Sequence, residues 1–223
     1  MEKFIIELTK EEMERCISFS KKSAESQQPI EFGQHDTIPR GVAEIARDNL
    51  IGKMAELAVS RKLRELFGLH IPIDYEIYPR GEWDDCDIAI NGWNVDIKST
   101  RIGHWLLFEW HKLRIRAPQN KLPHAVFMCK TPWDMEKDVP LGTVEIVGTV
   151  SLRRLLSNDP RVRTLRKGDC IPGTKARLQA DNYGIEFGDL NHDFKSVVEY
   201  MMTHTPPDTS KYPQPYLFHK EIK

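Results

Sequence analysis

The stretch Asp87-Ile-Ala-Ile-Asn-Gly-Trp-Asn-Val-Asp-Ile-Lys98 decides the fold of this 223-residue chain. An Asn-Gly pair between two runs of alternating apolar residues predicts a β-hairpin with a two-residue type I′ turn, because both turn positions need positive φ. Counting outward from Asn91-Gly92 places Asp87 opposite Asp96 and puts Lys98 on the same side. The apolar residues share the other side: Ile88, Ile90, Trp93, Val95 and Ile97. One side of the hairpin is therefore predicted to enter the core, and the other to carry chemistry.

The two opposed acids are candidate ligands of a divalent cation. Like charges directly opposite each other in a sheet are destabilising unless something compensates them. Mg²⁺ is commonly held by one or two carboxylates together with water and substrate phosphate. The alternative is that Lys98 neutralises both acids in a surface salt bridge, which is worth about 0–1 kcal/mol and implies no function. If the acids form a metal pocket, replacing either by Asn should stabilise the metal-free protein.

The acid, acid and lysine pattern resembles that of the PD-(D/E)XK nuclease superfamily. In that family one acid opens the second core strand, and an acid, any residue and a lysine follow in the third. Asp87 matches the first acid and Asp96-Ile97-Lys98 match the rest, although Cys86 stands where the family name has proline. These enzymes often carry a glutamate on the preceding helix, and Gly52-Lys-Met-Ala-Glu56-Leu-Ala-Val supplies one. The resemblance covers roughly residues 41–155.

The resemblance implies an α/β fold with a restriction-endonuclease-like mixed β-sheet core flanked by helices. It implies a Mg²⁺-dependent deoxyribonuclease, with Mn²⁺ as a substitute, that hydrolyses DNA phosphodiesters endonucleolytically and leaves 5′-phosphates. Asp87, Asp96, Glu56 and the carbonyl of Ile97 would hold the metal, and Lys98 would orient or deprotonate the attacking water. Two alternatives stay open: a non-catalytic nucleic-acid-binding module on the same fold, and a metal-dependent ribonuclease.

Charge is distributed unevenly along the chain. The formal net charge of −1 and the pI near 6.7 are not those of a typical nucleic-acid binder. From Arg101 to Lys130, however, six Lys or Arg residues accompany one acid, Glu109. A basic segment beside an acidic pocket suits a phosphodiester substrate, so Arg101, Lys112 and Arg114 are the predicted DNA contacts. A homodimer would let a single-site enzyme cut both strands.

Four widely spaced cysteines without a C-x-x-C pair argue against a zinc ribbon or a disulfide framework and fit a reducing compartment. The N-terminus has no export signal, and no apolar run approaches about 18 residues. A cytoplasmic protein without membrane association is therefore expected.

Further elements are predicted on both sides of the hairpin. A capping box at Thr9–Glu12 opens a helix that ends near Gln27, and Gly68 stops a long helix that begins at Val42. Apolar runs predict strands at Phe4–Leu8, Ile71–Tyr78, Ala125–Lys130 and Val144–Val150, and Ser151 begins another helix. The chain is accordingly divided into an N-terminal elaboration (1–40), the nuclease core (41–157) and a C-terminal elaboration with a proline-rich tail (158–223), within one compact domain.

Overall fold

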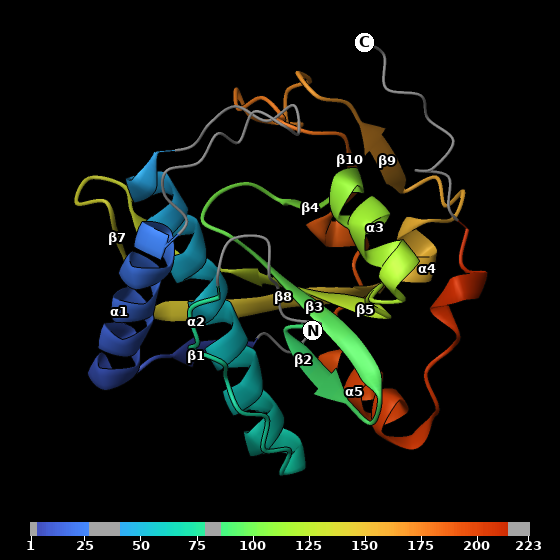
Figure 1. Cartoon of the computed structure of the whole chain (residues 1–223), viewed down its shortest axis with the longest axis horizontal. Coiled ribbons are helices and arrows are strands. Elements are labelled where there is room, and N and C mark those ends of the chain that lie inside the picture. The colour runs from blue at the N-terminus through green and yellow to red at the C-terminus, as the bar shows by residue number, and fades with distance from the viewer. Residues whose placement is uncertain (1–3, 27–40, 79–85, 214–223) are drawn as a thin grey trace.

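A five-stranded mixed sheet with strand order β1-β8-β5-β3-β2 organises the chain (Figure 1). The computed structural model describes residues 4–26, 41–78 and 86–213. The sheet consists of β1 (Phe4–Glu7), β2 (Ile88–Ile90), β3 (Trp93–Thr100), β5 (Ala125–Lys130) and β8 (Thr143–Ser151). Strands β3 and β5 run parallel, whereas the other neighbours are antiparallel. The predicted mixed α/β class is confirmed.

The Asn91-Gly92 hairpin forms as predicted. Both turn residues have positive φ, 46° for Asn91 and 81° for Gly92, and the register pairs Ile88 with Val95 and Ile90 with Trp93. The Asn91 side chain also donates to the carbonyls of Met201 and Met202, at 3.2 and 3.1 Å. The turn is thereby attached to the end of helix α5 (Phe194–Thr203).

Helix α2 (Val42–Phe67) packs on one face of the sheet, and α1 (Lys10–Ser26) lies against α2 (Figure 1). Residues at helical spacing on α2 enter a core that includes the apolar side of the hairpin: Met54, Ala55, Ala58, Val59 and Leu63. Gly68 ends α2 with a φ of 66°. The Thr9–Glu12 capping box is present, since the Thr9 amide donates to Glu12 and the Glu12 amide to the Thr9 hydroxyl.

A second layer covers the opposite face of the five-stranded sheet. It is built from a three-stranded sheet in the order β4-β10-β9, together with α3 (Trp110–Arg116) and α4 (Leu152–Leu155). Its strands span Trp105–Glu109 (β4), Val162–Leu165 (β9) and Asn182–Glu186 (β10). Short elements complete the structure: β6 (Trp133–Asp134), β7 (Val139–Pro140), η2 (Ala117–Gln119), η3 (Phe187–Asp189) and η4 (Thr209–Lys211). Both faces of the central sheet are therefore buried.

The prediction of a strand at Ile71–Tyr78 is wrong. This segment has no regular secondary structure and instead runs beside α2, whose side chains bind its carbonyls. Ser60 Oγ donates to the Ile71 carbonyl at 2.6 Å, and Lys53 Nζ donates to the Asp74 carbonyl at 2.8 Å. Backbone groups that a neighbouring strand would have satisfied are thus bound by a helix.

The segments on either side of residues 41–157 share the core with it. Phe4 and Ile6 of β1, and Phe194, Val198 and Met201 of α5, belong to the same buried cluster as α2 and the hairpin. The Ser151 cap forms, with its side chain accepting from the Arg154 amide, but the helix that it begins has only four residues. Within the described ranges, no helix combines the length and apolar character needed to cross a bilayer.

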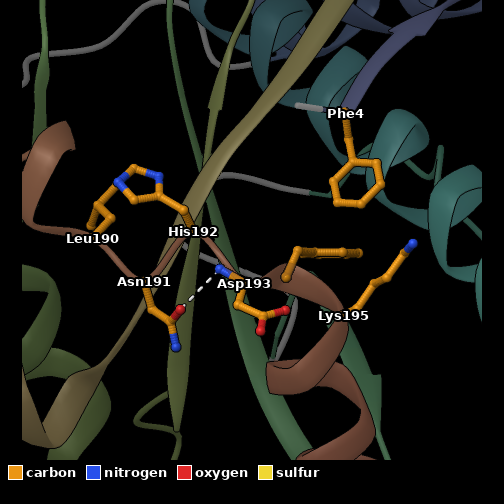
Figure 2. A pocket seen from close by; sticks show the side chains of 7 residues that line it. Phe4, Leu190, Asn191, His192, Asp193 and Lys195 are labelled. Atoms are coloured by element: carbon orange, nitrogen blue, oxygen red, sulfur yellow. Dashed lines mark hydrogen bonds between the residues drawn. The ribbon is translucent and has the colours of Figure 1, made fainter. Parts of the chain in front are cut away.

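A bulge in β8 fixes the chain that leads into α5. The pairing of β5 with β8 shifts between Met128 and Cys129, which leaves Val147 outside the ladder. His192 Nδ1 hydrogen-bonds to the Val147 carbonyl at 2.8 Å, and a Cβ on Gly148 would lie 2.8 Å from Leu190 Cβ. The adjoining cavity has a volume of about 460 Å³ and is lined by Phe4, Leu190, Asn191, His192, Asp193, Phe194 and Lys195. Figure 2 shows His192 beside Leu190 and Asn191 in this lining. The His192 contact satisfies the bulged carbonyl, and so its role is structural.

Candidate active site

Strand β3 places Asp96 and Lys98 between the two layers. They pair with Val126 and Met128 of β5, which belong to the apolar cluster beneath β4 and α3. Asp96 is only 1 % exposed, whereas the Lys98 side chain keeps 23 % of its surface exposed. Asp96 is therefore enclosed, whereas Asp87 and Lys98 on the same side of the hairpin each keep part of their surface exposed.

Two cations hold the Asp96 carboxylate. Arg116 NH1 donates to Oδ1 at 2.7 Å, and Lys98 Nζ forms an ion pair with Oδ2. The Lys98 Nζ also lies 5.2 Å from the centre of the Phe108 ring of β4. Burial acts to raise the pKa of Asp96, but the positive charges of Lys98 and Arg116 outweigh it and hold this pKa below its usual value.

Asp87 lies just before β2 and faces the same group of charges. Its Oδ2 accepts a hydrogen bond from the Ile97 amide at 2.5 Å. Burial, and next the negative charge of Asp96, raise the pKa of Asp87 to about 6, against the opposing effects of Lys98 and Arg116. Two neighbouring carboxylates thus have pKa values shifted in opposite directions, an arrangement typical of functional sites.

Asp87→Asn is expected to stabilise the metal-free protein at neutral pH. Between the ordinary pKa of 3.8 and the raised value of about 6, the folded state binds more protons at Asp87 than the unfolded state does. Stability therefore falls as pH rises through this window, and the penalty is fully present above it. In EDTA at pH 7.5 the variant should melt about 2–4 °C higher than wild type, corresponding to about 1 kcal/mol. Most of this gain should be absent at pH 4, and a gain independent of pH would contradict the assignment.

Glu56 has different partners from the two aspartates. Its Oε2 lies 2.5 Å from Lys53 Nζ, which lies 4.7 Å from the centre of the Phe19 ring of α1. Burial is the main cause that raises the pKa of Cys16 and of Tyr75, and the negative charge of Glu56 adds to the rise at both groups. Among the described residues, no group of three or more His, Cys, Asp or Glu is arranged to hold a metal ion. The structure therefore brings Asp87, Asp96 and Lys98 together, but it does not join Glu56 to them in a three-acid site.

The three predicted DNA-contact residues lie in different surroundings. Arg101 stacks over Trp133 at 5.1 Å and lies 4.0 Å from the Asp138 carboxylate. Lys112 lies 3.8 Å from Glu109, and its pKa is lowered by burial and then by the positive charge of Lys98. Arg114 is half-buried on α3. Of the three, Lys112 has the clearest electrostatic link to the acidic pair.

Arg116 belongs to the site but was not predicted from the sequence. It follows Lys112 by four residues, so the two side chains share a face of α3. That spacing is the signal that would have favoured Arg116 over Arg114 once the helix was recognised.

Comparisons of the chain with protein-family models, with curated proteins and with solved structures found no significant match. The chemistry of the site is accordingly inferred from its own residues. Asp87 and Asp96 carry the hard oxygen atoms that Mg²⁺ prefers as ligands, and burial, followed by repulsion from Asp96, raises the pKa of Asp87. A divalent cation would offset that repulsion. Because both Asp96 oxygens are already bound by Lys98 and Arg116, the cation would have to displace at least one of them.

Proposed function

We propose that this protein is a Mg²⁺-dependent deoxyribonuclease with a restriction-endonuclease-like core. The observation that carries the proposal is the pair of carboxylates with opposite pKa shifts, Asp87 and Asp96, beside Lys98. The order of elements supports it: a long helix, a hairpin that bears the acids, then a helix and a strand parallel to β3. Strand β5 pairs parallel with β3, so Asp96 lies on an interior strand of the sheet, whereas Asp87 lies just before the edge strand β2.

Each residue of the pair and its neighbours has a role in the proposed hydrolysis. Asp87 and Asp96, with the carbonyl of Ile97, would hold the metal. Bound Mg²⁺ or Mn²⁺ lowers the pKa of water and offsets charge on the phosphate. Lys98 orients the attacking water, and Lys112 supplies positive charge for the DNA backbone. The water oxygen bonds to phosphorus and gives up a proton as the bond between phosphorus and the 3′ oxygen breaks. The 3′ oxygen takes up a proton, which leaves a 5′-phosphate and a 3′-hydroxyl.

One observation favours a second candidate, a non-catalytic module that binds nucleic acid. Lys98 and Arg116 already neutralise Asp96, and Glu56 is paired with Lys53, so the acids could serve structure alone. A ribonuclease would use the same residues, because the 2′-hydroxyl has no part in this mechanism.

A metal-dependent digest separates these functions. Purified wild-type protein should convert supercoiled plasmid to nicked and linear forms with Mg²⁺ or Mn²⁺, and EDTA should stop the reaction. The ends should accept a ligase only while their 5′-phosphates are intact. Cleavage that survives EDTA contradicts the proposal, cleavage confined to a matched RNA identifies a ribonuclease, and binding without cleavage of either identifies the module. Direct conversion to the linear form, together with a dimer mass in solution, would support the proposed homodimer.

A further inference from the structure

We propose that Arg116 is a catalytic residue of this site. Its guanidinium neutralises Asp96 before the metal binds, and the side chain then rotates so that the guanidinium contacts the scissile phosphate. The inference rests on the proposed nuclease function. It adds the group that recognises the substrate's phosphate and explains how an acid already bound by two cations can accept a metal.

The guanidinium of Arg116 is only partly used in the metal-free protein. NH1 binds Asp96 Oδ1 at 2.7 Å, and among the described residues the other guanidinium nitrogens of Arg116 have no hydrogen-bond partner. The side chain is 21 % exposed, so these donors can reach a ligand that enters from solvent. A planar guanidinium with spare donors matches two oxygens of one phosphate, which a lysine ammonium does not.

The backbone that carries Arg116 is firmly held. Trp110 and Leu113 anchor α3 in the apolar cluster of the second layer. The Trp110 amide donates to the Asp181 carbonyl at 3.0 Å, and the Lys121 amide donates to the Arg116 carbonyl at 3.0 Å. A move of the guanidinium therefore requires only rotation of the Arg116 side chain and leaves the helix in place.

The charges of the site provide the reason for that move. Lys98, Arg116 and Lys112 bring three positive charges to a site in which Asp87 and Asp96 supply two negative charges. A bound dication would leave positive charge in excess around Asp96, and repulsion would then act on the cations that contact it. A phosphodiester supplies the missing negative charge. Arg116 is the cation best able to respond, because Lys98 projects from an interior strand over Phe108 and Lys112 lies near Glu109.

Two substitutions, Arg116→Gln and Arg116→Lys, test the inference through metal affinity and cleavage measured separately. Mn²⁺ binding to the DNA-free protein is measured by calorimetry, and plasmid cleavage is measured at saturating metal. Arg116→Gln removes the cation that competes for Asp96, so it should bind Mn²⁺ about tenfold more tightly and yet cleave about 100-fold more slowly. Arg116→Lys should keep metal affinity near wild type but still lose cleavage, because it offers no paired donors.

Opposite changes in affinity and cleavage distinguish this role from others. If Arg116 only supported the fold, Arg116→Gln would weaken both; if it only competed with the metal, both would improve. Either result, or unchanged cleavage, overturns the inference. If Arg116→Gln does not fold, Arg116→Lys provides the test: near wild-type Mn²⁺ affinity with lost cleavage supports the inference, and unchanged cleavage overturns it. The matched control is Arg64→Gln, which removes a positive charge from an exposed position on α2 and should change neither quantity.

Failure of the inference and failure of the proposed function give different results. A wild-type protein that binds Mn²⁺ and cleaves DNA, with Arg116 variants that behave like it, removes only the role of Arg116. A wild-type protein that neither binds Mn²⁺ nor cleaves removes the nuclease proposal, and the inference with it.

Discussion

Lys98→Ala should slow DNA cleavage by about 10²–10⁴-fold at saturating Mg²⁺, which is the range expected for loss of one group that acts on the attacking water. The Lys98 Nζ lies at the Asp96 carboxylate, and strand β3 supplies both residues. Mg²⁺ affinity should not fall, because the substitution removes a cation that competes for Asp96. Rates are compared on supercoiled plasmid with Mg²⁺ and then with EDTA.

The control for Lys98→Ala must separate chemistry from folding. Lys175→Ala removes an exposed lysine and should leave both the cleavage rate and the melting temperature unchanged. In Lys98→Ala, Arg116 still holds Asp96 Oδ1, so a fall of only a few degrees in melting temperature is expected. A wild-type cleavage rate in Lys98→Ala would remove the proposed mechanism.

Local interactions explain which parts of the fold could be predicted from the sequence. The hairpin register depends on the positive φ that Asn91 and Gly92 adopt, and α2 depends on its own apolar spacing and on Gly68. Each signal lies within a few residues of the structure that it determines. The pairing of Lys53 with Glu56 is equally local, at a spacing of three residues on one helix, and it could have been predicted as well.

Contacts between distant segments explain the rest. Ile71–Tyr78 has the composition of a strand, but a strand needs a partner, and Ser60 and Lys53 of α2 bind its carbonyls instead. The enclosure of Asp96 depends on β4 and α3, which the sequence did not place over the hairpin. The ion pair between Arg116 and Asp96 spans 20 positions of the chain. In each case the decisive partner is set by packing, which no local pattern encodes.

Asp96→Asn is expected to destabilise the protein, contrary to the sequence-based expectation that Asn at either acid would be stabilising. The substitution leaves Lys98 and Arg116 without their buried counter-charge, and breaking a buried pair in this way costs about 3–5 kcal/mol. Because both cations keep about a fifth of their surface exposed, hydration should reduce the loss to about 2–3 kcal/mol, or about 5–10 °C in melting temperature. The measurement is thermal unfolding in EDTA at pH 7.5.

The matched control is Glu65→Gln, because the Glu65 side chain is 64 % exposed in its pair with Lys62; this substitution should cost less than about 1 kcal/mol. The loss in Asp96→Asn should also shrink in an Arg116→Gln background, because one of the stranded cations is then gone. If Asp96→Asn costs the same stability in the wild-type and Arg116→Gln backgrounds, the ion pair between Arg116 and Asp96 does not contribute to stability.

The pH dependence of the Asp96→Asn effect has the opposite sign to that of Asp87→Asn. The pKa of Asp96 is lowered by folding, so its contribution is present above the ordinary value of 3.8 and is lost only as pH falls through the lowered value. At pH 7.5 one acid of the pair should therefore destabilise the metal-free fold while its neighbour stabilises it. A solvated salt-bridged strand pair would give small effects of one sign at both positions. Opposite signs at Asp87 and Asp96 would instead identify a buried site in which the fold supports one charged acid and leaves the other to be compensated by a ligand.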